Sequence, residues 1–406
     1  MKDKKIETLC LKEERRQRET LNLIPSENYV SRDVLHALGS IFVNKYSEGY
    51  PGARYYGGNE VVDTLENLTH ERALKLFHLS SKEWSANVQP YSGSPANLAV
   101  YAALVPPGGV IMGMELAMGG HLTHGHNVSL TGRIWQQLPY GVDSTTETLD
   151  FEKLAAQARE HRPALIVAGY TAYSRIIDFA ALREVANSVS AKLLIDLSHV
   201  AGLVAGGVYP SPFPHADVVM TTTHKTLRGP RAAIIFSRGE HAKLIDRAVF
   251  PGVQGGPHNN QIAAVAVALS EASKPEFKRY AKQVVKNAQV LAQSIIDRGW
   301  RVVSGGTDTH LFLIDTMTRG VSGREAERLL GKAGIIVNKN AIPFDMRKPF
   351  DPSGIRVGTP ALTTRGMKEG EMVLLAGWID DVLRERKSPA AIRKETLKLA
   401  KRFRLP

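Results

Sequence analysis

The chain has 406 residues, of which 43% are apolar and 23% charged, enough for one large α/β domain and a smaller one. Its single cysteine, Cys10, excludes a disulfide framework or a thiolate metal cluster within the chain. No apolar run reaches the roughly 18 residues of a membrane span, and no leader-like segment opens the chain, so we expect a cytoplasmic protein without membrane contact. The net charge of +12 suits anionic ligands of several kinds, from phosphate esters and polycarboxylates to nucleic acid.

The first predicted element is a polar helix over residues 1 to about 20, followed by a loop in which Pro25 and Asn28 stop the helical pattern. We expect residues 1–59 to form an N-terminal arm with loops. From 60 to 275, short β-branched runs alternate with helical patterns, which predicts a large domain with a mostly parallel sheet and helices on both faces. The predicted strands are 110–112, 165–167, 193–195, 218–220 and 233–236.

Residues 276–406 predict a smaller α+β domain. A long helix is expected from Pro275 to about Arg298, followed by strands at 301–303 and 310–314 mixed with helices. In the last segment, 384–404, basic residues alternate with apolar ones such as Ile392 and Leu399. We favour a solvated terminal helix for this segment over a nucleic-acid or membrane contact.

Two residues of the large domain form the most informative pair. Asp196 ends the predicted strand 193–195, and Lys225 follows 29 residues later within a Thr/His run. Such a lysine can form a Schiff base, and such an aspartate can hold a protonated pyridine nitrogen, which together are what pyridoxal phosphate needs. Ser92-Gly93-Ser94 lies just before a predicted helix from Ala96 to about Leu104, where hydroxyls and free backbone N–H groups can hold a phosphate.

The order of motifs around this pair resembles the serine hydroxymethyltransferase family of fold-type I pyridoxal phosphate enzymes, nearly end to end. That resemblance implies an α/β transferase fold, with a mostly parallel central sheet in a large domain and a smaller C-terminal α+β domain. The motifs that carry it are at residues 23–28, 44–52, 54–58, 92–94, 119–125, 223–231, 254–257, 338–340 and 354–361.

The resemblance implies a set of cofactor contacts. It implies that Lys225 holds pyridoxal phosphate, that Asp196 pairs with the ring nitrogen and that His121 stacks on the ring. Further cofactor contacts are implied at Ser92, Gly93, Ser94, Thr171, His199, Thr222 and His224, and, from the partner subunit, at Tyr46 and Gly256. The active sites would then be shared across a homodimer, and pairing of dimers into tetramers stays open.

For the substrates, the resemblance implies L-serine and glycine, with tetrahydrofolate as cosubstrate and 5,10-methylenetetrahydrofolate as product. The amino acid carboxylate would be bound by Arg356, Ser26 and Tyr56. Glu48 from the neighbouring subunit, with Tyr55 beside it, would manage proton transfer near the serine hydroxyl. The folate pocket is implied at Leu116, Gly120, Leu122 and Asn340.

Several alternatives stay open at this point. His121, His124 and His126 fall within six residues, but no cysteine or fixed carboxylate accompanies them in the sequence, so we expect no metal. A folate-independent pyridoxal phosphate aldolase for threonine-like β-hydroxy amino acids would use the same carbanion chemistry. Nucleic-acid binding through the basic surface is a third, less favoured function.

The chain also departs from the pattern associated with the family. The departures are Met118, Thr171, Ser198 and the pair Ala232-Ala233. Thr171 keeps a hydroxyl where a serine is usual, and the others are not interpreted as catalytic groups. Met118 adjoins the implied folate region and leaves a modified folate or a methylated serine-type substrate open.

Overall fold

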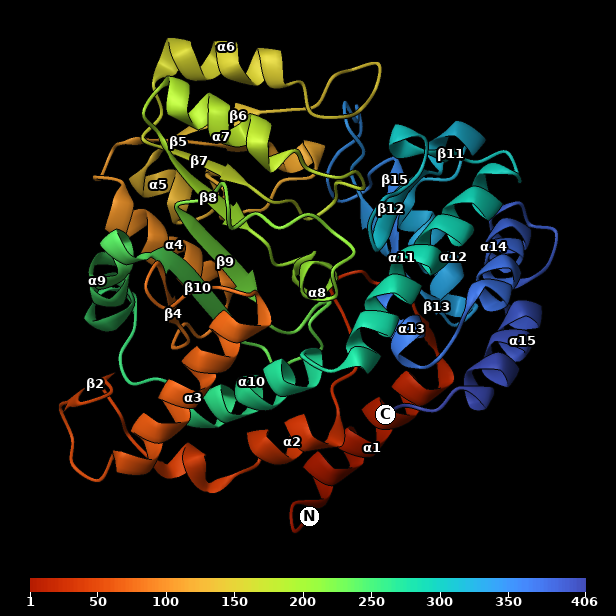
Figure 1. Ribbon diagram of the computed structural model, residues 1–406. Coiled ribbons are helices and arrows are strands. Elements are labelled where there is room, and N and C mark those ends of the chain that lie inside the picture. The colour runs from red at the N-terminus through yellow and green to blue at the C-terminus, as the bar shows by residue number, and fades with distance from the viewer. The chain divides into compact units, whose positions relative to one another are not determined.

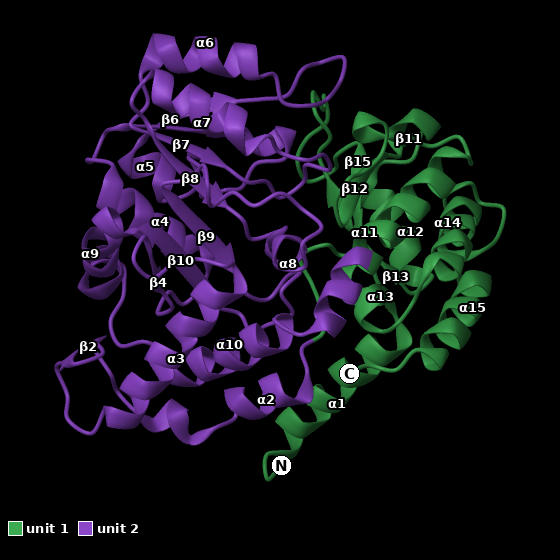
Figure 2. Ribbon diagram, viewed as in Figure 1, with its two compact units in different colours: residues 1–29, 283–406 green, residues 30–282 purple.

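The computed structural model describes residues 1–406, which form two compact units (Figure 2). One unit is residues 30–282, and the other joins residues 1–29 to residues 283–406. The domain boundaries expected from the sequence, 1–59, 60–275 and 276–406, stay a prediction. None of the helices is both long and apolar enough to cross a membrane.

The unit of residues 30–282 is built on a seven-stranded sheet with the order β4-β10-β9-β8-β7-β5-β6 (Figure 1). Neighbouring strands are parallel throughout, except that β10 runs antiparallel to both β9 and β4. This confirms the expected mostly parallel sheet. The strands are β4 Trp84–Asn87, β5 Val110–Met114, β6 Gln136–Tyr140, β7 Leu165–Ala168, β8 Lys192–Asp196, β9 Val218–Thr222 and β10 Ala233–Arg238.

Helices cover both faces of this sheet. Helices α4 and α9 contact each other on one face, and α6 and α7 lie together on the side away from them (Figure 1). The helices are α2 Arg32–Leu38, α3 Glu60–Leu76, α4 Gly93–Leu104, α5 Thr131–Ile134, α6 Phe151–His161, α7 Phe179–Ser188, α8 Ala201–Ala205, α9 Gly239–Arg247, α10 Asn259–Ala272 and the start of α11 Pro275–Ile296. Short helical turns lie at η1 Ile41–Asn44, η2 Leu116–Met118 and η3 Ala248–Val253.

The core between α4 and the sheet follows from two periodicities. Along α4, Ala96, Val100 and Tyr101 share the buried face, as a 3.6-residue period requires. Every second residue of the strands meets them, as with Leu165 and Val167 of β7. Strands of this kind are buried on both faces, which explains their continuous apolar runs. The packed sheet therefore forms a rigid platform whose strand ends carry the loops described below.

The other unit contains a four-stranded antiparallel sheet with the order β11-β12-β15-β14, and β1 pairs with β13 apart from it. The strands are β1 Leu21–Asn22, β11 Arg301–Val302, β12 Leu311–Asp315, β13 Ile335–Ile336, β14 Asn338–Asn340 and β15 Gly354–Gly358. The helices are α1 Lys4–Glu19, the end of α11, α12 Gly323–Lys332, α13 Pro360–Thr364, α14 Glu369–Leu383 and α15 Pro389–Arg402, with turns η4 Val303–Gly305 and η5 Met317–Arg319.

The two ends of the chain pack together within this unit, where α1 contacts α15. The predicted N-terminal helix is confirmed, and it ends at Glu19. In the basic C-terminal segment, Ile392 and Leu399 of α15 are buried in the core of the unit, while Lys394 and Lys398 are exposed. Its apolar residues are therefore used in packing. A short hairpin, β2 Gly49–Tyr50 and β3 Ala53–Arg54, lies in the unit of residues 30–282.

Candidate active site

The carboxyl ends of four neighbouring strands, β5, β7, β8 and β9, carry most of the predicted cofactor residues. His121 follows β5, Thr171 follows β7, Asp196 ends β8, and Lys225 comes three residues after the end of β9. In open α/β sheets, ligands bind in the crevice at this edge, because loops from adjacent parallel strands meet there. The sheet thus brings together residues that are more than one hundred positions apart in the chain (Figure 1).

The Asp196 carboxylate is the best-held polar group at this edge. Its Oδ2 accepts hydrogen bonds from His124 Nε2 at 3.0 Å and from Asn97 Nδ2 at 3.1 Å. Its Oδ1 accepts from the Ser198 backbone N–H at 3.1 Å and from the Ser198 hydroxyl. Both oxygens of this buried side chain are therefore fixed by donors.

His124 and Lys225 decide the ionisation of Asp196. Burial by itself raises the pKa of the carboxyl, but the hydrogen bond and charge of His124, with the charge of Lys225, outweigh burial and hold the pKa well below its usual range. A group with a depressed pKa stays ionised until the pH falls below that value. Asp196 is therefore a carboxylate throughout the neutral range, as a partner of a protonated ring nitrogen has to be.

Lys225 lies in a tightly braced turn after β9. The Thr226 hydroxyl donates to the His199 carbonyl at 3.0 Å and accepts from the Gly202 N–H at 2.9 Å. The Arg228 N–H donates to the Lys225 carbonyl at 3.1 Å, and Arg228 has a left-handed backbone with φ of 57°. Its guanidinium stacks 4.2 Å from the centre of the Tyr280 ring. The backbone under Lys225 is thus held from three sides.

The amino end of α4 forms a cradle that suits a phosphate group. Helix α4 begins at Gly93, and the side chain of its N-cap residue, Ser92, makes no capping hydrogen bond. A Cβ placed on Gly93 would lie 2.7 Å from Thr222 Cγ2, so only glycine allows the helix to approach β9 this closely. The buried Thr222 hydroxyl has no hydrogen-bond partner within the chain. Uncapped N–H groups and this hydroxyl, with the anionic Asp196, fit pyridoxal phosphate.

The histidines around this edge have separate environments. His121 Nδ1 lies 2.7 Å from the Thr123 hydroxyl, His124 binds Asp196, and His126 Nδ1 accepts from the Val128 N–H. Burial, with the nearby charges of His124 and Lys225, lowers the pKa of His121 to about 4. Its ring is therefore neutral at pH 7, as suits stacking on a protonated pyridine ring.

His224, next to Lys225, is also neutral. Burial and the charges of Lys225 and Arg231 lower the pKa of His224 to about 3. The half-buried Thr171 is tied to the loop after β5, because its N–H donates to the Gly119 carbonyl at 2.8 Å.

A second group of predicted residues lies on the hairpin loop of residues 45–56. The Tyr46 hydroxyl is 3.2 Å from Glu48 Oε1, and the Tyr46 and Tyr56 rings meet edge to face at 5.0 Å. The loop around Gly256 packs on the same side chains, since a Cβ on Gly256 would lie 3.3 Å from the Tyr46 ring. Tyr55 contacts the Phe250 ring instead. The chain therefore places Tyr46, Glu48, Tyr56 and Gly256 together on one surface.

The predicted folate residues of this unit follow β5. Leu116 and Leu122 are exposed apolar side chains, and Gly120 in the same loop is buried. The unusual Met118 packs over Gly141, because a Cβ on that glycine would lie 2.4 Å from the methionine sulfur. The loop thus presents leucines to solvent while Met118 is directed at the chain segment after β6.

The remaining predicted residues, Arg356, Ser26 and Asn340, belong to the other unit. Arg356 is buried on β15, and its Nε donates to Asn338 Oδ1 at 3.1 Å. Burial lowers the pKa of the Arg356 guanidinium to about 10, so it stays charged at neutral pH. The loop before Ser26 packs on the end of this strand, where the Gly358 N–H donates to the Leu23 carbonyl at 2.8 Å. Asn340 ends the neighbouring strand β14.

Three partners of Asp196 were missed by sequence reasoning. Ser198 was noted only as a departure outside the catalytic groups, yet its hydroxyl bonds to Asp196 and accepts from the Thr222 N–H at 3.0 Å. His124 was considered only as a metal ligand. Asn97 was not considered, although a buried asparagine in an otherwise apolar helix is itself a sign of a polar partner.

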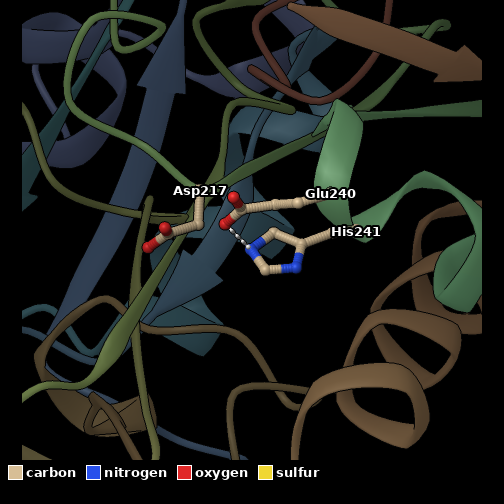
Figure 3. A group of neighbouring side chains, drawn as sticks. All are labelled: Asp217, Glu240 and His241. Carbon is tan, nitrogen blue, oxygen red and sulfur yellow. Dashed lines mark ion pairs between the residues drawn. The ribbon is translucent and has the colours of Figure 1, made fainter.

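A further group of possible metal ligands lies at the opposite end of β9. Ligand atoms of Asp217, Glu240 and His241 lie within 4.8 Å of one another, and His241 Nε2 is 3.1 Å from Glu240 Oε1 (Figure 3). Asp217 Oδ2 already accepts from Arg183 at 2.7 Å, and Lys192 Nζ lies within 4 Å of both carboxylates. Because these two cations balance the two carboxylates, we interpret the group as an ion-pair network of the sheet edge.

A mostly parallel sheet whose carboxyl edge carries a buried, ionised aspartate, a neutral histidine and a lysine on a braced turn defines a fold-type I pyridoxal phosphate-dependent enzyme. A family model described as serine hydroxymethyltransferase matches residues 1–379. The chain belongs to the serine hydroxymethyltransferase family and is a pyridoxal phosphate-dependent transferase that uses tetrahydrofolate as cosubstrate.

Named relatives agree with this assignment. The serine hydroxymethyltransferase of Koribacter versatilis is 57% identical over 387 residues, which cover 95% of this chain and 90% of the relative. That of Acidothermus cellulolyticus is 56% identical over 380 residues, covering 94% and 88%. That of Sorangium cellulosum is 53% identical over 407 residues, covering 100% and 95%. The similarity therefore spans both compact units.

Proposed function

We propose that this enzyme interconverts L-serine and tetrahydrofolate with glycine and 5,10-methylenetetrahydrofolate at a site built around Lys225. The observation that carries this proposal is the ionised Asp196 carboxylate, held by four hydrogen bonds at the strand edge that also carries Lys225. When bound, pyridoxal phosphate supplies an electron sink that stabilises a carbanion at the substrate α-carbon. The protein provides binding, orientation and proton transfer.

Each predicted residue then has a proposed task toward the cofactor. Lys225 Nζ holds it covalently, Asp196 keeps the ring nitrogen protonated, and the neutral His121 ring stacks on it. Ser92, Gly93 and Ser94 bind the phosphate through their N–H and hydroxyl groups. The walls of the cofactor site are completed by Thr171, His199, Thr222 and His224.

The predicted substrate residues also have proposed tasks. Arg356 binds the amino acid carboxylate, because a guanidinium can make two parallel charged hydrogen bonds to it. Ser26 and Tyr56 add further contacts, and Glu48 with Tyr55 transfers protons at the serine hydroxyl. The folate is contacted by Leu116, Gly120 and Leu122. The side-chain amide of Asn340 recognises its pterin ring.

The enzyme works as a homodimer in which Tyr46, Glu48 and Gly256 serve the partner's site. Support comes from the surface of residues 41–61, which exposes large apolar side chains that a monomer would leave in water. These are Ile41, Val43, Tyr46, Tyr55, Tyr56 and Val61. A tetramer would add a second interface. We place the enzyme in the cytoplasm, where its single, exposed Cys10 would stay reduced.

Subunit complementation tests the shared site. Chains carrying Lys225→Ala and Glu48→Gln are co-expressed with different tags, and the heterodimer is purified on both. If each site takes Lys225 from one chain and Glu48 from the other, one of the two sites is intact, so the heterodimer should regain about half of the parent activity. A heterodimer as inactive as both homodimers would contradict the sharing.

Folate dependence tests the reaction itself. Serine turnover by the purified enzyme is measured as glycine formed, with and without tetrahydrofolate, and threonine cleavage serves as a control reaction. We expect tetrahydrofolate to stimulate serine turnover by about 100-fold or more, since the cosubstrate binds the released one-carbon unit. Equal serine turnover without folate, with faster threonine cleavage, would favour the aldolase function instead.

A further inference from the structure

The loop that carries Glu48 is held by donors along its whole backbone. Five successive carbonyls, of residues 45–49, each accept a hydrogen bond. Asn259 Nδ2 donates to the first and Lys45 Nζ to the second, and the Tyr55 N–H donates to the Glu48 carbonyl at 3.0 Å. These hydrogen bonds restrain the backbone on both sides of Glu48 through contacts made within the chain.

Arg54 supplies the two bonds that flank Glu48. Its Nη1 donates to the Ser47 carbonyl at 2.9 Å and to the Gly49 carbonyl at 2.7 Å. Gln89 Nε2 adds a second donor to the Gly49 carbonyl at 2.9 Å. One guanidinium nitrogen therefore joins the residues on either side of Glu48 and fixes the direction in which its side chain leaves the backbone.

The Arg54 guanidinium is itself held by two carboxylates of α3. Its side chain is only 4% exposed, Nε pairs with Asp63 at 2.8 Å, and Nη2 pairs with Glu66 at 2.5 Å. Both acids lie one helical turn apart on α3, and Gln89 Nε2 also donates to Glu66 Oε1 at 2.8 Å. Arg54 thus connects a rigid helix to a functional loop, with charged hydrogen bonds on one side and peptide carbonyls on the other.

The Glu48 carboxylate has neighbours whose spacing depends on this arrangement. Its Oε1 lies 3.2 Å from the Tyr46 hydroxyl, and a Cβ placed on Gly255 would come within 3.2 Å of the same oxygen. A shift of the loop would change both distances. An error of about 1 Å in a reacting group can lower a rate by about 100-fold.

We propose that Arg54 is a positioning residue that acts through Glu48, by binding the carbonyls of Ser47 and Gly49. The inference rests on the proposed role of Glu48 in proton transfer. It requires an arginine, because the ammonium of a lysine is a single point with three donors and cannot span both carbonyls and both carboxylates. Arg54→Lys therefore keeps the charge that Asp63 and Glu66 need while it removes the planar fork.

A double-mutant cycle tests the proposal with four enzymes, the parent, Arg54→Lys, Glu48→Gln and the double variant. For Arg54→Lys we expect kcat with serine and tetrahydrofolate to fall by about 10- to 100-fold. KM for serine, the cofactor absorbance band and the melting temperature should change little. When Arg54→Lys is added to the Glu48→Gln enzyme, kcat should fall by less than about twofold, because the side chain that Arg54 positions is already inactive.

Arg183→Lys is the matched control, because Arg183 makes a comparable pair with Asp217 away from the site. It should leave turnover unchanged. If Arg54→Lys does not fold, Gln89→Met replaces it in the cycle, with a smaller loss of kcat expected because Arg54 still holds the Gly49 carbonyl.

If Arg54→Lys lowered kcat by the same factor in the parent and in the Glu48→Gln enzyme, the inference would be overturned, since Arg54 would then act independently of Glu48. An unchanged Arg54→Lys enzyme beside an inactive Glu48→Gln enzyme would overturn this inference alone. A fully active Glu48→Gln enzyme would instead remove the proposed role of Glu48, and the inference with it.

Discussion

Replacing Lys225 with alanine is expected to lower serine turnover by about 1000-fold or more, because the variant loses both the covalent attachment point and an amine that can move protons. The visible absorbance of the bound cofactor should also shift, since no lysine imine can form at this position. Steady-state glycine formation and the absorbance spectrum of the purified variant measure the two effects.

The fold should survive this substitution. The turn around Lys225 is held by Thr226, Arg228 and Gly229 through backbone and hydroxyl contacts, none of which uses the lysine side chain. The melting temperature should therefore stay close to that of the parent. Lys278→Ala, which removes an exposed lysine of α11, is the matched control and should be fully active. Normal turnover by Lys225→Ala would contradict the assignment of the catalytic lysine.

Replacing Asp196 with asparagine is expected to give the second largest loss. Removing one partner of a buried ion pair costs about 3–5 kcal/mol. Since about 1.4 kcal/mol corresponds to a tenfold change in rate, kcat should fall by about 100- to 4000-fold. Asparagine has the same shape and still accepts from the Ser198 N–H, so pyridoxal phosphate should still bind. Cofactor content and kcat, measured on the same preparation, separate binding from rate.

The pH dependence gives this prediction a further check. The pKa of Asp196 lies well below the usual range, so lowering the pH from 8 to 5 should not reproduce the loss caused by asparagine. Ser198→Ala is a suitable control, because it removes one donor to the carboxylate and keeps the charge. An Asp196→Asn enzyme with unchanged kcat would contradict the role of the carboxylate.

Much of the large unit could be predicted from local patterns. The strands at β5, β7, β8, β9 and β10 were expected within one or two residues, because each is a short β-branched run buried on both faces. The edge strands β4 and β6 were not expected. Each is short and partly polar, and β6 contains Pro139, which an edge strand tolerates but a central strand does not.

Within the candidate site, the same division holds. Lys225, Asp196 and the residues at 92–94 were predicted from motifs that are contiguous in the sequence, and the fold places them at connected strand and helix ends. The partners of Asp196 were not predicted, since Asn97 and His124 are 99 and 72 residues away from it in the chain. No local pattern relates residues so distant, whose meeting depends on the order of the strands.

The sequence by itself therefore determined the family, the cofactor and the approximate strand positions, because these depend on ordered motifs and on side-chain periodicity along short segments. Only the tertiary structure decided how charges and hydrogen bonds are shared. It showed that His124 and Lys225 keep Asp196 ionised, that Asn97 and Ser198 also donate to its carboxylate, and that Arg54 holds the loop of Glu48 against α3. Burial and long-range donors set these properties, and both arise only when distant segments pack together.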